Sequence, residues 1–200
     1  MVYTVNFAID NQAADKIITI SEQALEMLEK DDDYQNIYHN REEYEIIFCE
    51  YISRAYETKV EFENGNLEKQ MYYEKIENYC KRAIVLLDEE KETTRKTKLA
   101  MMQKLCKAYI GMSEQRLAEQ LYEEMVVIFS KESDDRENFF IGHMKLLCEM
   151  EKRKNNEIEK WNLSKIKKLY QKAIVEVPEI KNNSNWQKIL EDIGEDNLEK

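Results

Sequence analysis

Long stretches of this chain run without a residue that breaks helices. Only four glycines and one proline occur among its 200 residues, whereas average usage would place roughly 14 glycines and 10 prolines in such a chain. Folds built from many tight turns, such as sandwiches, barrels and propellers, need far more of these residues. The glycines also stand far apart, which excludes a glycine-rich phosphate loop. We therefore expect an all-α protein.

Apolar residues recur at helical spacing over nearly the whole sequence. In the clearest case, which begins near Arg41, apolar side chains follow one another at steps of three and four residues without a gap. This stripe consists of Tyr44, Ile47, Phe48, Tyr51, Ile52, Ala55 and Tyr56. It predicts a helix that buries one broad face. The residues predicted to face inward from the helix over 13–30 are Ile17, Ile20, Ala24, Met27 and Leu28.

Turn residues and capping residues divide the rest of the chain into further helices. Asn64–Asn66, Gly111 and Pro178 are predicted to end helices. The predicted N-caps are Thr93–Thr94, Ser113, Ser133, Ser164 and Ser184, the last in an S-x-x-Q capping box with Gln187. Residues 1–12 are expected to form a short first helix, because no other segment offers a strand partner. The sequence thus predicts about nine antiparallel helices in a single domain over residues 1–200.

The charge of the chain excludes several classes of partner. Its net charge of −11 disfavours non-specific binding to nucleic acid, which needs a cationic surface. No run of 18 apolar residues exists, so we expect no membrane span, and the first residues lack the pattern of a signal peptide. Cys49, Cys80, Cys106 and Cys148 lie beside apolar helical positions, which indicates reduced core thiols and a cytoplasmic protein.

A weak internal repeat resembles the packing of tetratricopeptide repeats. A small or apolar residue recurs at Ala24, Ala83, Met125 and Ala173, where the second helix of such a repeat approaches its neighbour. The intervals are 59, 42 and 48 residues, whereas a tetratricopeptide array repeats about every 34 residues. The unequal period favours a fixed helical domain over a generic repeat.

Motifs spread in order over nearly the whole chain resemble those of the 14-3-3 family. The segment 42–51, EEYEIIFCEY, is similar to that family's EERNLLSVAY. Residues 75–77 and 86–88 resemble the KIE and LLD at the two ends of its fourth helix, with about one helical turn missing between them. Further similar segments are 99–101 (YLKM), 118–124 (A…AYEE), Arg136 and Glu149 at the spacing of R…E, 169–176 (AFDDAIAE) and 196–198 (DNL).

The resemblance implies a dimeric, all-helical adaptor that has no catalytic activity. Its helices would form a 14-3-3-like or tetratricopeptide-like right-handed array. Each protomer would hold an extended phosphoserine or phosphothreonine peptide in a concave amphipathic groove. The dimer would form through the N-terminal helices, with about residues 1–30 of one chain against 41–90 of the other. Because a phosphate dianion needs several converging donors, the family grips it with a lysine, two arginines and a tyrosine.

The family's phosphate grip is only partly present here. Its lysine falls on Ile52, and one arginine falls on Lys59. Its Arg-Tyr pair falls on Lys107 and Ala108, with Tyr109 one step further. Lysine lacks the fork geometry of arginine, and isoleucine donates nothing. Lys59, Lys107 and Tyr109 are therefore candidate phosphopeptide-binding residues, and binding is expected to be weak, altered or lost. Alternatively, both lysines are simply solvated surface residues.

Three further positions are candidates for lining the groove. Ile52 replaces the family's lysine, Gly142 stands where the family has the asparagine that steadies the peptide backbone, and Glu149 keeps the acidic residue of the R…E motif. The alternative function is a tetratricopeptide-type scaffold that binds unmodified peptides or proteins.

Nothing in the sequence forms a recognisable catalytic or metal-binding constellation. The chain has two histidines. His39 lies in a polar segment without an evident partner, and His143 lies near an apolar helix face, where a structural role is expected rather than a catalytic one. No cysteine and histidine cluster has the spacing of a zinc site. We therefore expect no metal, no cofactor and no enzyme activity.

Overall fold

The structure is a computed structural model, which describes residues 10–30, 41–88, 91–130, 136–155, 157, 160–194 and 198. The secondary-structure elements in these residues are eight α-helices and one short 3-10 helix, with no strand. The predicted all-α class is therefore confirmed for the described part of the chain. The short first helix expected over residues 1–12 depends on residues 1–9, which lie outside that part, so a total of nine helices stays a prediction. Two other predicted features, the cap at Ser133 and the histidine His39, also lie outside the described residues.

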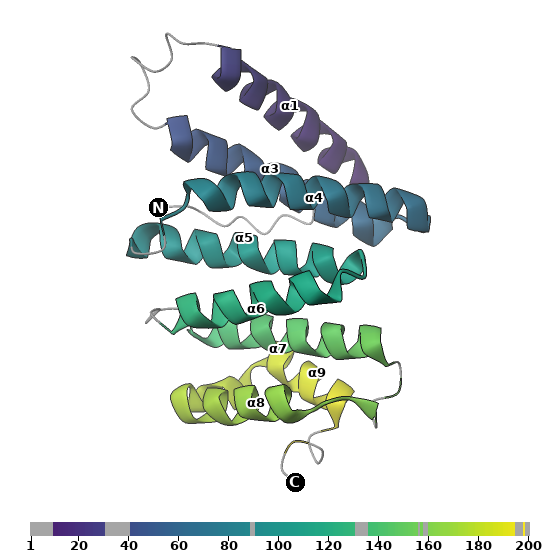
Figure 1. The fold of residues 1–200 in the computed structure, drawn as a ribbon, viewed down its shortest axis with the longest axis vertical. Coiled ribbons are helices and arrows are strands. Elements are labelled where there is room, and N and C mark those ends of the chain that lie inside the picture. The colour runs from purple at the N-terminus through teal and green to yellow at the C-terminus, as the bar shows by residue number, and fades with distance from the viewer. Residues whose placement is uncertain are drawn as a thin grey trace. The chain divides into compact units, whose positions relative to one another are not determined.

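The chain divides into two compact units, Met1–Asp88 and Glu89–Lys200, whose helices Figure 1 labels along the colour scale. Each unit buries apolar side chains of its own. The single domain expected over residues 1–200 stays a prediction.

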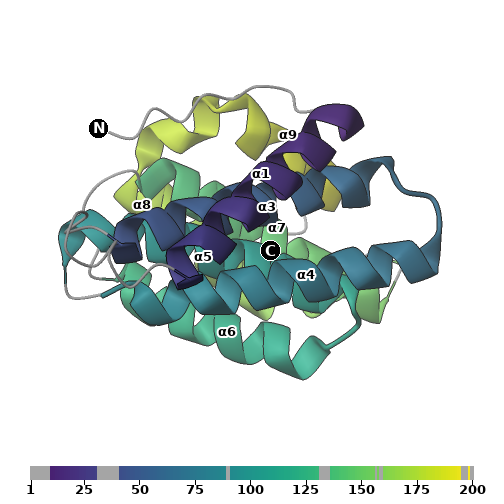
Figure 2. The same ribbon diagram turned by 90° about the horizontal axis from the view of Figure 1, so that it is seen from above.

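The first unit consists of three helices packed side by side. They are α1 (Asn11–Lys30), α3 (Arg41–Phe62) and α4 (Asn66–Leu86). The predicted break at Asn64–Asn66 is confirmed, since α3 ends at Phe62 and α4 begins at Asn66. Helix α3 packs against both α1 and α4 (Figures 1 and 2), so it is the centre of this unit.

The prediction that Tyr44 and Tyr51 face the core of the first unit is wrong. Tyr44 is 39% exposed and Tyr51 is 51% exposed, whereas Cys49, Ile52 and Tyr56 are buried. Because α1 and α4 both cover α3, its buried face is set by two neighbours, and the periodic stripe alone does not identify it. The remaining buried residues of α3 are Ser53 and Ala55.

The predicted buried face of α1 is also partly wrong. Ile20 is 64% exposed and Met27 is 59% exposed, although both were expected inside. The buried residues are Ala14, Ile18, Ser21, Leu25 and Leu28. These positions repeat at steps of three and four residues, as a buried helix face requires. Helix α1 thus carries a second apolar stripe beside the one that it buries.

Polar contacts link the helices of the first unit around Arg82 of α4. Its guanidinium donates to Glu45 of α3 at 2.6 Å and to Glu29 of α1 at 2.8 Å. The Tyr79 hydroxyl of α4 donates to Glu22 of α1 at 2.8 Å. Because Arg82 is partly exposed, each of these ion pairs is worth at most about 1 kcal/mol. They fix the register of helices that apolar burial already holds together.

The second unit contains the remaining elements. They are α5 (Glu92–Gly111), α6 (Gln115–Phe129), α7 (Arg136–Lys154), α8 (Ser164–Glu176), the 3-10 helix η2 (Pro178–Asn182) and α9 (Ser184–Ile193). Helix α7 contacts α5, α6, α8 and α9. It is the central helix of this unit.

The predicted helix ends of the second unit are confirmed, but four of its predicted caps are wrong. Ser164 is the first residue of α8, whose N-cap is Leu163. Helix α5 ends at Gly111, and Pro178 follows the end of α8. The N-cap of α9 is Asn183 instead of Ser184, because the Asn183 side chain accepts from the backbone N–H groups of the next turn. Ser113 adopts a φ of 64° and precedes the N-cap Glu114. Thr93–Thr94 lie inside α5, whose N-cap is Lys91.

His143 lies in the aromatic core of the second unit. Its ring centroid is 5.4 Å from that of Tyr122 and 5.3 Å from that of Phe129, and Phe139 and Phe140 pack on the same phenyl ring of Phe129. The imidazole is fully buried, and neither ring nitrogen has a hydrogen-bond partner in the described part of the chain. Burial therefore lowers the pKa of His143 to about 4.

This lowered pKa predicts a specific loss of stability in acid. The folded state holds His143 neutral, while the unfolded state binds a proton below the ordinary pKa of about 6.5. The free energy of unfolding should therefore fall as the pH drops from about 6.5 to 4, by about 3 kcal/mol in total from this residue. Replacing His143 by leucine should remove that part of the dependence. Urea unfolding at a series of pH values measures it, with His39→Leu as the control. Parallel curves for wild type and His143→Leu would contradict the prediction.

Candidate functional site

Lys59, the first candidate for gripping phosphate, is already engaged within the first unit. Its ammonium forms an ion pair with Asp15 at 2.5 Å, and only 13% of its side chain is exposed. The same nitrogen lies 5.5 Å from the ring centroid of Tyr72, which adds a cation–π contact. A ligand phosphate at this position would have to displace the Asp15 carboxylate.

Ile52 has no exposed surface. It is fully buried in the first unit among the other core residues of α3. Its side chain therefore stabilises the fold and does not present a surface to a ligand in this structure.

The other four candidates lie on two neighbouring helices of the second unit. Lys107 of α5 is exposed, whereas Tyr109 of the same helix is buried. Lys107 acts electrostatically on Glu149 of α7, which places these two charges in one region. Gly142 of α7 faces α5 so closely that a Cβ atom there would lie 2.7 Å from the Nε2 of Gln103. The structure thus brings Lys107 and Glu149 together, and it packs the side-chain amide of Gln103 against Gly142.

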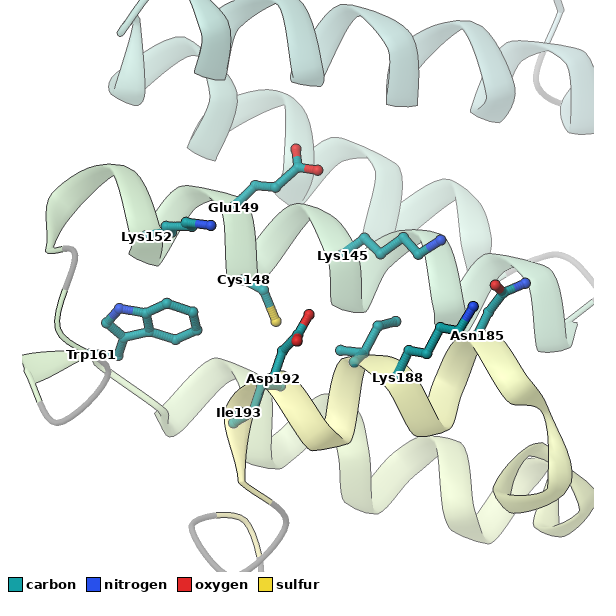
Figure 3. A pocket seen from close by; sticks show the side chains of 10 residues that line it. Lys145, Cys148, Glu149, Lys152, Trp161, Asn185, Lys188, Asp192 and Ile193 are labelled. Atoms are coloured by element: carbon teal, nitrogen blue, oxygen red, sulfur yellow. The ribbon is translucent and has the colours of Figure 1, made fainter. Parts of the chain in front are cut away.

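An open cleft of about 650 Å³ lies between α7 and α9 (Figure 3). One wall comes from α7, the other from α9, and Trp161 from the segment between α7 and α8 closes one end. Glu149, the groove residue predicted from the sequence, belongs to this cleft. The full lining is Lys145, Cys148, Glu149, Lys152, Trp161, Asn185, Lys188, Ile189, Asp192 and Ile193.

The charges of the cleft are mixed, with three lysines against two carboxylates. Figure 3 shows Glu149 directed to the side of α7 away from α9, while Asp192 lies between the two helices. Burial raises the pKa of Glu149 above its ordinary value, against the lowering influence of the lysines nearby. Figure 3 also shows Lys152 at the same end of the cleft as Trp161, and Lys145 and Lys188 at the opposite end.

Cys148 is the one nucleophilic side chain in the lining of this cleft. Figure 3 shows its sulfur pointing from α7 toward α9. Burial raises the pKa of the Cys148 thiol to about 12, and the carboxylates of Glu149 and Asp192 raise it further. At neutral pH the group is thus a protonated thiol, which is a poor nucleophile.

A smaller cavity of about 200 Å³ lies beside α6, α7 and the start of α8. Its main cation, Lys154, is held by two carboxylates, at 2.7 Å from Glu119 and at 3.0 Å from Glu151. These pairs satisfy its charge internally, so the α7–α9 cleft is the stronger candidate for a ligand site.

Sequence reasoning missed most of the cleft. Trp161, Asn185 and Lys188 follow Lys145 by 16, 40 and 43 residues, and no motif links them. The only usable signal was the stripe of polar residues Lys145, Glu149 and Lys152 on an otherwise apolar helix, which indicates a solvent-facing side of α7.

The described residues contain no group of three or more histidine, cysteine, aspartate or glutamate side chains placed to hold a metal ion. Among those residues, too, no helix combines the length and the apolar character that crossing a membrane requires. Comparison of the chain with models of protein families, with curated proteins and with solved structures finds no match. The relation to the 14-3-3 family stays a prediction from the sequence motifs.

The raised pKa of Cys148 predicts slow alkylation. With a pKa about three units above that of an ordinary thiol, its thiolate fraction at about pH 8 falls roughly 1,000-fold. The greater nucleophilicity of a more basic thiolate recovers part of this. Iodoacetamide should therefore modify Cys148 about 30- to 60-fold more slowly than glutathione. Mass spectrometry of timed samples measures the rate, and Cys148→Ser identifies its peptide. A rate near that of glutathione would show that the thiol is ionised and able to act as a nucleophile.

Proposed function

We propose that this chain is a non-catalytic adaptor that binds an extended peptide segment of a partner protein in the α7–α9 cleft. The observation that supports this most directly is the cleft itself, which is open and whose lining combines three amines, two carboxylates and one amide with the apolar side chains of Ile189 and Ile193. Its volume lies within the range typical of ligand pockets, about 300–1,000 Å³. That space accommodates a few side chains of an extended segment.

The state of the titratable groups supports a binding role over a catalytic one. Burial raises the pKa of Cys49 to about 11 and that of Cys106 to about 12. His143 is neutral and lies inside an aromatic core. General acid–base catalysis needs a group that titrates near the working pH and reaches a substrate. None of these side chains meets both conditions.

We propose that the adaptor is of 14-3-3 type and that its phosphate pocket is degenerate. Lys59 is neutralised by Asp15, and Ile52 is buried. An anion on the bound peptide, phosphate included, would instead meet Lys145 and Lys188 in the second unit. The cytoplasmic location predicted from the four cysteines belongs to this proposal, since three of these thiols are buried and none forms a disulfide.

A second candidate is a tetratricopeptide-type scaffold that binds unmodified peptides. The Lys59–Asp15 pair favours it, because one of the predicted phosphate contacts is already satisfied within the protein. The two candidates differ in whether phosphate adds to affinity.

A pair of peptides separates the candidates. We expect a fluorescent phosphoserine peptide to bind about tenfold more tightly than its serine twin, because the phosphate gains charge-assisted contacts with cleft amines. Lys188→Gln should reduce this ratio, and Lys59→Gln should leave it unchanged. Fluorescence polarisation measures both affinities, and Lys168→Gln on the exposed side of α8 is the matched control. Equal binding of the two peptides would favour the scaffold, and binding of neither would contradict both functions.

We further propose that the chain forms a homodimer through its N-terminal helices, with about residues 1–30 against 41–90. The support is apolar surface left open on the first unit. On α1, Ile20 and Met27 are exposed, with Ile17 and Ala24 half-buried along the same stripe. On α3, the exposed residues are Tyr44 and Tyr51, seven positions apart and so on one helix face.

Charge placed on the α1 stripe should separate the protomers. The double variant Ile20→Glu, Met27→Glu keeps the buried face of α1 intact, so it should fold, but burying two carboxylates between protomers is unfavourable. Light scattering should give twice the 24.1 kDa of one chain for wild type and a single chain for the variant. Val175→Glu, on a residue 79% exposed on α8, is the control. A monomeric wild type, or a variant that stays dimeric, would contradict this interface.

A further inference from the structure

The α7–α9 cleft has two chemically different ends. Figure 3 shows α7 and α9 running in the same direction, so that Lys145 lies beside Asn185 and Lys188 at one end. Two amines and a side-chain amide converge there. Trp161 stands at the opposite end, with Ile193 beside it. Lys152 lies at that end as well. A ligand that fills the cleft therefore meets two amines and an amide at one end, here called the cationic end, and an aromatic ring with a single amine at the other, the aromatic end.

The amines at the cationic end are available to a ligand. Neither Lys145 nor Lys188 forms an ion pair with a carboxylate of the described residues, in contrast to Lys154 and Lys165 of the same unit, which do. Asn185 adds an amide that can donate to an anion. The Glu149 carboxylate acts on Lys145 electrostatically but forms no ion pair with it, so both amines remain able to contact an anion directly, although the chain as a whole is acidic.

The tryptophan at the other end is held in place by the protein. Its indole N–H donates to the backbone carbonyl of Asn155 at 2.8 Å. Because this bond uses the only polar atom of the side chain, the half-exposed ring offers the cleft apolar and aromatic surface alone. This end suits an aromatic or large aliphatic side chain.

The helices themselves give the distance between the two ends. Lys145 lies at the cationic end and Lys152 near Trp161 at the other end. These two residues are seven positions apart on α7, which corresponds to about 10 Å along the helix axis. An extended peptide advances about 3.3 Å per residue. The two ends are therefore about three peptide residues apart. Asp192 lies between them, where it disfavours a second anion.

We propose that the cleft recognises a peptide segment in which an anionic side chain, carboxylate or phosphate, lies about three residues from an aromatic or large aliphatic one. The anion contacts Lys145, Lys188 and Asn185, and the apolar side chain packs on Trp161 and Ile193. This inference rests on the proposed peptide-binding function and names the ligand class for the same cleft.

The two tryptophans of the chain make the binding visible. Trp186 is fully buried in the core, whereas Trp161 is half-exposed in the wall of the cleft. A peptide that packs on Trp161 should change the intrinsic fluorescence of the wild-type protein. In Trp161→Phe that change should disappear, while binding measured by polarisation should persist because the phenyl ring still offers an apolar surface.

The test uses labelled decapeptides of glycine and serine that carry one aspartate and one leucine, two to six positions apart in either order. Phosphoserine and asparagine versions replace the aspartate, which separates the two sources of negative charge from a neutral isostere. We expect the tightest binding at a separation of about three residues in one order, and about tenfold weaker binding for asparagine. The phosphoserine version should bind at least as tightly as the aspartate version.

Paired changes in protein and peptide locate each contact. Lys188→Gln should weaken binding of the aspartate peptide about tenfold and leave binding of the asparagine peptide unchanged. Lys168→Gln should change the affinity for neither peptide. Trp161→Ala should weaken binding of the leucine peptide. It should leave binding unchanged for a peptide with alanine in place of the leucine. Thermal unfolding checks that each variant folds, and Trp161→Phe gives the same test with less risk to the fold.

The outcomes separate this inference from the function on which it rests. The inference is supported if Lys188→Gln weakens only peptides that carry the anion and Trp161→Ala weakens only peptides that carry the leucine. Saturable binding that ignores the separation, the charge and Lys188 would overturn the inference and leave the peptide-binding function standing. Binding of none of the peptides would overturn both.

Discussion

The burial of α7 on several sides is the constraint on which the second unit depends. This helix contacts α5, α6, α8 and α9, and it carries Phe139, Phe140 and His143 into the aromatic core. The same helix carries Lys145, Cys148 and Lys152 into the wall of the cleft. Because the core residues fix the rotation of α7, they also fix where the cleft residues point. Helix α7 thus both positions the candidate site and buries His143, whose ring nitrogens lack partners among the described residues, which lowers the free energy of unfolding.

The first unit depends on apolar packing in a different way. Its central helix α3 is covered on two sides, by α1 and by α4. Arg82 of α4 forms ion pairs with Glu45 of α3 and with Glu29 of α1, which link the three helices. Two neighbours still leave parts of the three helices uncovered, which is why Tyr51 on α3 and Ile20 on α1 remain exposed. These exposed side chains are the apolar surface that the proposed homodimer would cover.

The sequence predicted features that depend on near neighbours. Helical periodicity gave the class, and Gly111 and Pro178 marked real helix ends, because backbone conformation at those residues is a local property. The capping residues were misplaced by small steps. Asn183 competes with Ser184 for the same backbone donors, and an asparagine carbonyl reaches two of them. Local pattern alone does not decide between two good caps in succession.

Features that depend on distant contacts were beyond the reach of sequence patterns. The exposed side of α3 follows from the positions of α1 and α4, which no stripe within α3 encodes. The cleft joins Lys145, Trp161 and Lys188, whose separation in sequence hides their proximity. Glu149 was found only because a family motif pointed to its helix. Lys59, expected to bind phosphate, instead pairs with Asp15, which lies 44 residues away in the sequence.

The acidity of the chain weighs less against an anionic ligand than its net charge suggests. The first unit contains nine basic and nineteen acidic residues, a net charge of −10, and the second contains 21 and 22, a net charge of −1. Nearly all of the excess negative charge thus belongs to the unit without the cleft. Physiological salt screens charges beyond about 8 Å, so the field that a bound group experiences comes from its immediate neighbours. In the α7–α9 cleft those neighbours include Lys145 and Lys188, which no carboxylate of the described residues neutralises by an ion pair. A chain with a net charge of −11 can therefore still hold one negatively charged side chain, provided that the contact is short and local.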